Sequence, residues 1–343
     1  MPGTAPPLPD AVEVATQVVG YLSLAIPLGI GLTVGALAVP ESHGGLVSRR
    51  VRSLAVPTAV LVVLGLAVQF RAVSHLTGLT LIQLVAMVLT ACGLVAMRWT
   101  SSRALARGVA AVTVVAAISP VIPVQYANLS RVASSALTTV HVLGAMTWVG
   151  GLVVLPVTAF MLQRTTNGVE DEDRVAADWT QIWERFSLVA MIAVGALIVS
   201  GTWLAWSHVG TPGQLLTTAY GRALAIKLAL VVVLVCAGAY NVRVVLPRLH
   251  ALRQHGDRRG MFALAAQHFP MVVLGEALVA FCVLTVVPFL RGSARTQAGG
   301  PSAAPFDLTT FGTGVVLVAV VAVAMWLGAR RSLRPVAFST PTP

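Results

Sequence analysis

Long, uninterrupted apolar segments follow one another along almost the whole chain. A helix needs about 20 apolar residues to cross a hydrocarbon core of about 30 Å. Nine stretches reach or approach this length: residues 15–39, 54–70, 79–97, 105–124, 136–162, 187–209, 221–246, 270–290 and 311–329. Such segments must satisfy their backbone polar groups internally, and because they do not alternate in polarity, helices are expected rather than a barrel. The pattern predicts an all-α, polytopic transmembrane helical bundle of about nine spans.

Composition excludes a soluble globular domain and a nucleic-acid-binding protein. Of 343 residues, 57% are hydrophobic and 10% are charged, and the mean hydropathy is +0.85. A net charge of +11 could suggest nucleic acid, but the basic residues stand in short clusters at the ends of apolar segments. The sequence therefore predicts a multi-pass protein of the bacterial inner membrane, with the lipid bilayer as its surroundings.

The arginine clusters predict the orientation of the helices. Seventeen of the 22 arginines fall in every second connection, and the other five fall in the remaining connections or at helix ends beside them. The first group consists of Arg49, Arg50, Arg52, Arg98, Arg103, Arg107, Arg164, Arg174, Arg185, Arg243, Arg248, Arg253, Arg258, Arg259, Arg330, Arg331 and Arg334. Because basic residues accumulate on the cytoplasmic side, the N-terminus is expected outside and the C-terminus in the cytoplasm.

Three membrane regions are expected. Residues 1–132 form an N-terminal four-helix region, residues 133–292 a second four-helix domain, and residues 293–343 an outer linker, the ninth helix and a short basic cytoplasmic tail. The longest inner connection, 163–186, holds Trp179 and Trp183 one turn apart, which favours either a helix at the membrane interface or a solvated spacer. No phosphate loop, nucleophile elbow or metalloprotease motif is present, so a transporter is expected rather than an enzyme.

Ionisable and strongly polar residues within the spans are the candidate functional residues, because they are costly in lipid. They are His141, Lys227, Asn241, Glu276 and Gln83, with His75 and His208 near outer helix ends. The three cysteines lie in apolar segments and predict neither a disulfide nor a zinc site.

His141 and Lys227 are expected at the same depth, about 8–10 Å below the outer ends of their helices. Gly144, Ala145 and Trp148 share the helix face of His141, and small residues there let a neighbouring helix come close. The alternative is a histidine that only bonds two helices together. On the Lys227 helix, Tyr220 and Asn241 lie on the same stripe as the lysine. The two residues are therefore predicted to form one site in the outer half of the bundle.

Glu276 is expected near Asn241 and Arg243 in the inner half of the bundle, since their helices are antiparallel. A structural ion pair and a proton relay are the two hypotheses for this carboxylate. At the outer mouth, His75 and His208 are either metal ligands or solvated interface residues.

Several motifs resemble the copper resistance protein D family. They run over about 136–290 and comprise His141 to Gly151, Arg185-Phe-Ser, Gly201-Thr-Trp-Leu-Ala-Trp, Tyr220-Gly-Arg with Lys227, and Asn241 with Leu246-Pro-Arg. The resemblance implies a membrane protein that moves or binds copper, often with a periplasmic copper-binding partner. The implied copper ligands are His141, His75, His208 and Met146, although Met146 faces away from His141 and the outer loops hold no cluster of methionines or histidines.

The same histidine helix and lysine helix are also similar to the haem-binding membrane protoporphyrinogen oxidases. That similarity implies a haem-b-binding oxidoreductase or cofactor-assembly protein, in which His141 and Lys227 would hold the haem. A protonated lysine repels a metal cation, whereas an uncharged amine can bind one. Copper and haem therefore both stay open as ligands at this point.

Overall fold

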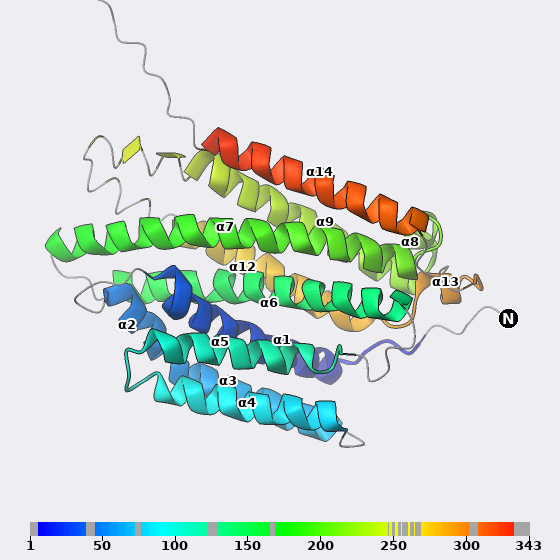
Figure 1. Ribbon diagram of the computed structural model, residues 1–343, viewed down its shortest axis with the longest axis horizontal. Coiled ribbons are helices and arrows are strands. Elements are labelled where there is room, and N and C mark those ends of the chain that lie inside the picture. The colour runs from blue at the N-terminus through cyan, green and yellow to red at the C-terminus, as the bar shows by residue number, and fades with distance from the viewer. Residues whose placement is uncertain are drawn as a thin grey trace, which may run out of the picture.

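The protein is built from helices. The computed structural model describes residues 6–38, 45–72, 77–122, 129–164, 169–245, 247–248, 251–252, 255, 260, 264, 269–301 and 308–332, and the longer ranges carry side-by-side helices (Figure 1). These elements are α1 (Ala11–Leu32), η1 (Thr33–Leu37), α2 (Leu46–Ser53), α3 (Ala55–Ala72), α4 (Gly78–Ala96), α5 (Arg103–Ile118), α6 (Leu129–Gln163), α7 (Val169–His208), α8 (Gln214–Thr217), α9 (Ala219–Tyr240), η2 (Asn241–Val245), α12 (Phe269–Val286), η4 (Val287–Phe289), α13 (Ala294–Gln297) and α14 (Leu308–Ser332). The predicted all-α bundle is confirmed.

Seven helical segments in the described residues are long and apolar enough to cross a membrane. Helices α5 and α14 occupy the other two predicted stretches but do not meet the same criterion. Helix α5 has 16 residues and ends at Ile118, whereas the prediction extended this stretch to 124. Pro120 explains the early end, because proline lacks the N–H that would continue the helical hydrogen bonds. That α5 and α14 also cross the membrane, which would make nine spans, stays a prediction.

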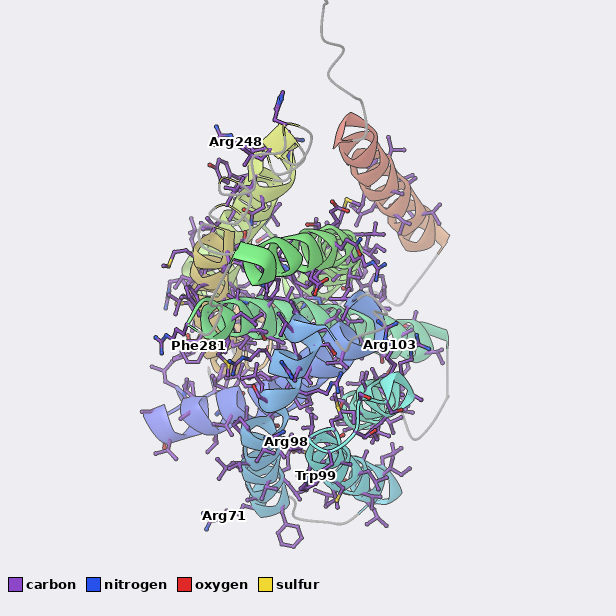
Figure 2. All side chains as sticks on the ribbon, turned by 90° about the vertical axis from the view of Figure 1, so that its left-hand side faces the viewer. Arg71, Arg98, Trp99, Arg103, Arg248 and Phe281 are labelled. Carbon is purple, nitrogen blue, oxygen red and sulfur yellow. The ribbon has the colours of Figure 1, made fainter. Side chains whose placement is uncertain are left out.

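The connections between antiparallel helices gather at two opposite ends of the bundle. The short connection between α4 and α5 lies at the left in Figure 1, whereas α8 and α13 lie at the right. Figure 2 looks at the bundle from the left-hand end of Figure 1 and labels three residues of the large arginine group, Arg98, Arg103 and Arg248. If this group marks the cytoplasmic side, α8 and α13 face outward.

Cysteine labelling tests this orientation. With the native cysteines replaced, Thr211→Cys, before α8, should react with an impermeant thiol reagent added to intact cells. Ser101→Cys, between α4 and α5, should react only after the cells are opened. Both positions are exposed in the structure, so access across the membrane is the only intended difference. Labelling of Ser101→Cys in intact cells would show that the orientation is opposite to the predicted one.

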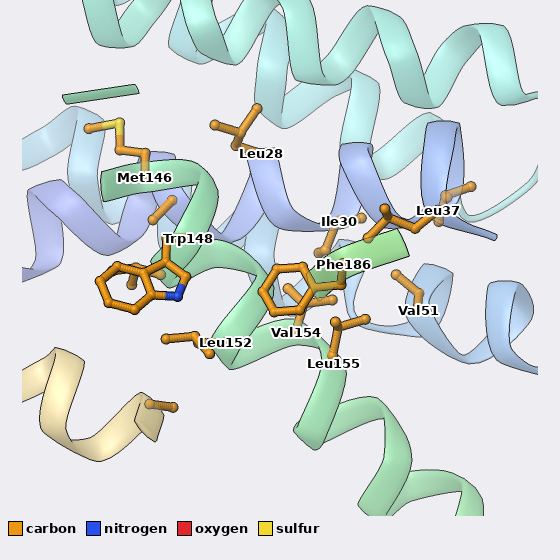
Figure 3. Packing of buried hydrophobic residues seen from close by; sticks show 14 of the residues in the cluster. Leu28, Ile30, Leu37, Val51, Met146, Trp148, Leu152, Val154, Leu155 and Phe186 are labelled. Carbon is orange, nitrogen blue, oxygen red and sulfur yellow. The ribbon is translucent and has the colours of Figure 1, made fainter. Parts of the chain in front are cut away.

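Helices α1 and α6 form the centre of the bundle and cross at two glycines. A Cβ atom built on Gly150 would collide with the carbonyl oxygen of Ala25, and one built on Gly29 would collide with the backbone of Gly150. The backbones therefore touch, as small residues allow at membrane helix crossings. Around this crossing lies the main apolar core, which contains Leu28, Ile30, Trp148 and Phe186 (Figure 3). The N-terminal region is thus packed directly onto the second region.

Arginines near the end of the first span have structural partners. Arg103 donates to the carbonyl oxygen of Ala38, Arg107 Nε to that of Gly35 at 2.9 Å, and Arg185 to that of Leu37 at 3.0 Å. These carbonyls belong to η1 and the residue after it, where the helix leaves oxygens without intrahelical donors. The arginines from α5 and α7 therefore complete the end of the first span.

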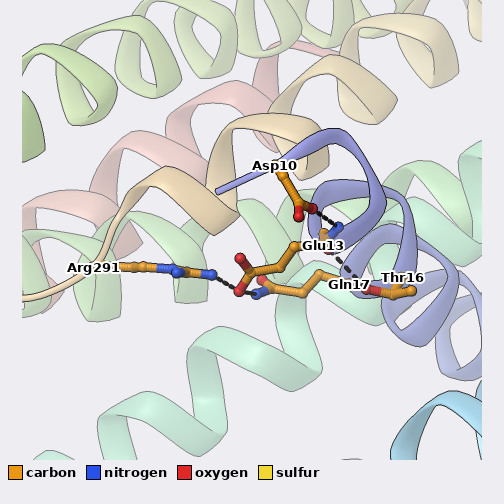
Figure 4. A network of polar contacts seen from close by, with 5 residues as sticks. All are labelled: Asp10, Glu13, Thr16, Gln17 and Arg291. Carbon is orange, nitrogen blue, oxygen red and sulfur yellow. Dashed lines mark hydrogen bonds and ion pairs between the residues drawn. The ribbon is translucent and has the colours of Figure 1, made fainter. Parts of the chain in front are cut away.

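A polar network holds the opposite end of α1. Asp10 caps the helix by accepting from the backbone N–H of Glu13 at 2.7 Å, and the Glu13 carboxylate pairs with Arg291 (Figure 4). Arg291 follows η4, so the pair joins the start of α1 to the outer end of the second region. Because both side chains are partly exposed, this ion pair contributes little stability by itself.

The connection 163–186 differs from both hypotheses. Helix α7 already begins at Val169 and continues without a break for 40 residues. Trp179 and Trp183 are fully buried and stack on each other, with ring centroids 5.3 Å apart. They belong to the same core as Val47 and Val51 of α2. An interface helix was wrong because these rings lie in an apolar core that also contains residues of α2, more than 120 positions earlier in the chain.

The outer linker also contains a structured turn. Ser293 caps α13 by accepting from the N–H of Thr296, and the N–H of Gly300 donates to the carbonyl oxygen of Arg295 at 2.8 Å. Gly299 has a φ of 72°, which a glycine adopts easily at a helix end. Residues 302–307 of the predicted linker lie outside the described residues.

Candidate functional site

His141 of α6 faces Ser200 of α7. Its Nδ1 atom lies 3.1 Å from the Ser200 hydroxyl oxygen, and Ser200 is fully buried. The Ser200 hydroxyl also lies 2.6 Å from the carbonyl oxygen of Ala196, one turn earlier in its own helix. Because a hydroxyl has one hydrogen and a carbonyl can only accept, Ser200 donates to Ala196 and accepts from His141 Nδ1–H. In the neutral imidazole, Nε2 is then the unprotonated nitrogen, with a lone pair for a metal.

Glycines make room for the imidazole between α6 and α7. A Cβ atom on Gly201 would lie 3.4 Å from His141 Cε1 and 3.7 Å from Nδ1. A Cβ atom on Gly144 would lie 3.3 Å from the carbonyl oxygen of Ala193. The two helices therefore approach closely at the level of the histidine, in agreement with the small residues on its face. Sequence reasoning missed Ser200 as the partner, because a serine in an apolar helix is a weak signal.

Lys227 of α9 is near enough to act electrostatically on the His141 ring. That the two residues form one site stays a prediction. Tyr220, seven residues earlier in α9, is buried, and its backbone N–H donates to the side chain of Gln297 at 3.1 Å. Its ring stacks on His208 with centroids 5.7 Å apart.

The other candidate metal ligands lie apart from His141. His208 Nδ1 is 2.7 Å from the carbonyl oxygen of Leu204, and His208 follows Ser200 by eight residues, about 12 Å along the helix. Met146 and Trp148 are buried in the apolar core (Figure 3). His75 falls outside the described residues. Within the described part of the chain, no three His, Cys, Asp or Glu side chains gather in a group suited to a metal ion.

A second polar pair lies between η2, which continues α9, and α12. Asn241 Nδ2 donates to Glu276 Oε1 at 2.6 Å, and both side chains are buried. Arg243, the expected ionic partner of Glu276, is exposed instead. The structure thus pairs Glu276 with a neutral amide.

Part of the chain matches a known protein family. Residues 180–290 match the family model described as copper resistance protein D, which is about a third of the 343 residues. No curated protein and no solved structure matches the chain. The matched segment contains Ser200, Lys227, Asn241 and Glu276, but it begins after α6 and so leaves His141 outside. The chain is therefore a helical, multi-pass membrane protein whose residues 180–290 match the family model of copper resistance protein D.

Proposed function

We propose that this protein carries copper ions across the bacterial inner membrane and that His141 Nε2 binds the ion on its way. The contact between His141 Nδ1 and Ser200 carries this proposal, since it makes Nε2 the unprotonated nitrogen. An imidazole nitrogen is a suitable ligand for copper. The match of residues 180–290 to the copper resistance protein D model supports copper as the cargo.

A site with few ligands suits transport better than storage. Conduction needs binding that is favourable enough for the ion to enter and weak enough for it to leave. His141 is the only histidine, and Lys227 the only lysine, in the described membrane segments of α6 and α9. Copper therefore meets one imidazole at this depth, and the amine of Lys227 can bind it as well when the amine is uncharged.

His208 provides a second position for the ion nearer the outer surface. It lies about 12 Å beyond Ser200 along α7, in the direction of α8 and α13. In the proposed orientation this is the periplasmic side, where a copper-binding partner protein would deliver the ion. His75, whose position the structure does not describe, is proposed to act at the same mouth.

A transport assay with a matched pair of variants tests the proposal. Purified protein in lipid vesicles should admit Cu(I) to a copper-sensitive dye inside, relative to empty vesicles. Ser200→Ala removes the acceptor for His141 Nδ1–H and should lower the uptake rate at limiting copper by about tenfold, the usual size of an indirect metal-site effect. Thr202→Ala, whose hydroxyl bonds only to the Ile198 carbonyl on the exposed side of α7, should leave the rate unchanged.

Two results would contradict copper transport. One is an uptake rate equal to that of empty vesicles although the reconstituted protein is folded. The other is purified protein with a Soret absorption band and stoichiometric haem iron but no copper binding. The second result would support the haem-binding alternative, in which His141 and Lys227 hold the haem.

A further inference from the structure

A buried carboxyl group and a buried amide form an isolated polar pair between α9 and α12. Asn241 is 5% exposed and Glu276 is 6% exposed. Asn241 opens η2, a stretch of wider π-helix that continues α9, and Glu276 lies in the middle of α12. Asn241 follows Lys227 by fourteen residues, about 21 Å along the helix. This pair is therefore separate from the site around His141.

The pair has one hydrogen bond where its chemistry allows two. Asn241 Nδ2 donates to Glu276 Oε1 at 2.6 Å, but Asn241 Oδ1 is buried without any hydrogen-bond partner. A carboxylate can only accept, so it cannot satisfy an amide oxygen. A protonated carboxyl can, because its O–H donates to Oδ1 while its carbonyl oxygen accepts from Nδ2. One added proton therefore supplies the donor that the pair lacks.

The alternative orientation of the Asn241 amide leads to the same number of protons bound by the pair. The nitrogen and oxygen of an asparagine amide fit the same space, and the hydrogen-bond network distinguishes them. In the exchanged orientation, Oδ1 would face Glu276 Oε1 at the 2.6 Å separation. Two oxygens at that separation need a hydrogen between them, which again places a proton on Glu276. The pair takes one proton in either orientation.

No positive charge balances Glu276 in the described part of the chain. Helix α12 packs against α9, α6 and α1. Their titratable or charged side chains are Tyr220, Arg222, Lys227, Cys236, Tyr240 and Arg243 on α9 and η2, Arg131 and His141 on α6, Glu13 and Tyr21 on α1, and Cys282 on α12 itself. None forms an ion pair with Glu276, and the nearest in sequence to Asn241, Arg243, is exposed. An unpaired carboxylate is costly in this setting, which favours the protonated acid.

We propose that Asn241 and Glu276 form a proton-binding site in the inner half of the membrane, where Glu276 takes up and releases one proton. Uptake converts the carboxylate into an acid and adds the second hydrogen bond, to Asn241 Oδ1, between α9 and α12. Release returns the proton to water and breaks that bond. The two states therefore differ in how firmly α9, which also carries Lys227, is joined to α12. This site is the proton-coupling element of the proposed copper transport, and its coupling role rests on that proposal.

Infrared spectroscopy tests proton binding without copper. Protein in lipid vesicles is titrated over a broad pH range, and the carbonyl stretching band of a protonated, buried carboxyl is followed. This band should disappear reversibly as the pH rises, and Glu276→Gln should lack it at every pH. Glu276→Gln preserves both hydrogen bonds, because its amide donates to Asn241 Oδ1 and accepts from Nδ2, so the variant should fold. Glu13→Gln, which changes a partly exposed carboxylate on α1, should keep the band.

A second measurement separates coupling from binding. A proton gradient directed along the copper gradient should raise Cu(I) uptake by wild-type vesicles severalfold, and Glu276→Gln should show the same uptake with and without the gradient. A band that persists unchanged in Glu276→Gln would overturn the proton site. Equal responses of wild type and Glu276→Gln to the gradient would overturn the coupling. Absence of copper uptake in wild type would instead contradict the proposed function, and the infrared result would still decide the proton site.

Discussion

Gly150→Leu is expected to abolish assembly of the folded bundle. A side chain at this position would occupy the space of the Ala25 carbonyl and the Gly29 backbone, neither of which can rotate away. Helices α1 and α6 would have to separate. The N-terminal region would then separate from the second region, to which α6 belongs. Overpacking of a well-packed core costs about 1–3 kcal/mol and more where backbone must move, so folded protein should fall by at least about tenfold.

Size-exclusion chromatography of detergent extracts, with a fluorescent tag to report the folded fraction, measures this effect. Gly108→Leu is the matched control, because a Cβ atom on this α5 glycine meets nothing within 4 Å. The control has the same change in residue type and also lies within a helix. A normal elution profile and unchanged melting temperature for Gly150→Leu would show that α1 and α6 do not cross at these glycines.

Replacement of either His141 or Lys227 is expected to remove most copper uptake, and replacement of both should cost no more. His141→Gln loses the imidazole nitrogen that is proposed to bind the ion. Lys227→Gln removes the amine, which in its uncharged form can bind the same ion. Each single variant should lower uptake by about tenfold or more, and residues that act in one site show such non-additive effects.

The double variant distinguishes a shared site from two independent structural roles. Uptake is measured in vesicles for wild type, both single variants and the double variant, and each rate is divided by the amount of folded protein. Glutamine retains hydrogen-bonding capacity, so a histidine that only joins two helices would tolerate it. Mild losses that add in the double variant would rule out a shared site.

Part of the candidate site followed from the cost of polar groups in lipid. His141, Lys227, Asn241 and Glu276 stood out because each interrupts an apolar helix. Helical depth placed Asn241 near Glu276, since neighbouring antiparallel helices traverse the same thickness. It also predicts Lys227 at the same depth as His141. Ser200 gave no such signal, because its hydroxyl is satisfied by the carbonyl of its own preceding turn. Only the packing of α6 on α7 revealed it as the partner of His141.

The positions of Trp179 and Trp183 show the same limit of prediction from sequence for the fold. As a sequence pattern, two tryptophans one turn apart beside an acidic segment fit an interfacial helix as well as a buried one. They are buried in a core that also contains residues of α2, which lies far away in the chain. In the same way, Arg243 was the natural charge partner of Glu276 by position, yet its side chain is exposed and the amide of Asn241 takes its place.

The sequence by itself determined that this is a helical membrane protein and where its helices lie, because lipid forces each backbone to satisfy its own hydrogen bonds within long apolar segments. It also marked the residues that are expensive to bury. Tertiary structure alone decided which helix faces meet, at Gly29 and Gly150 and at His141 and Ser200. These contacts join residues 121 and 59 positions apart, and they depend on shape and on single hydrogen bonds, which no local pattern of polarity records.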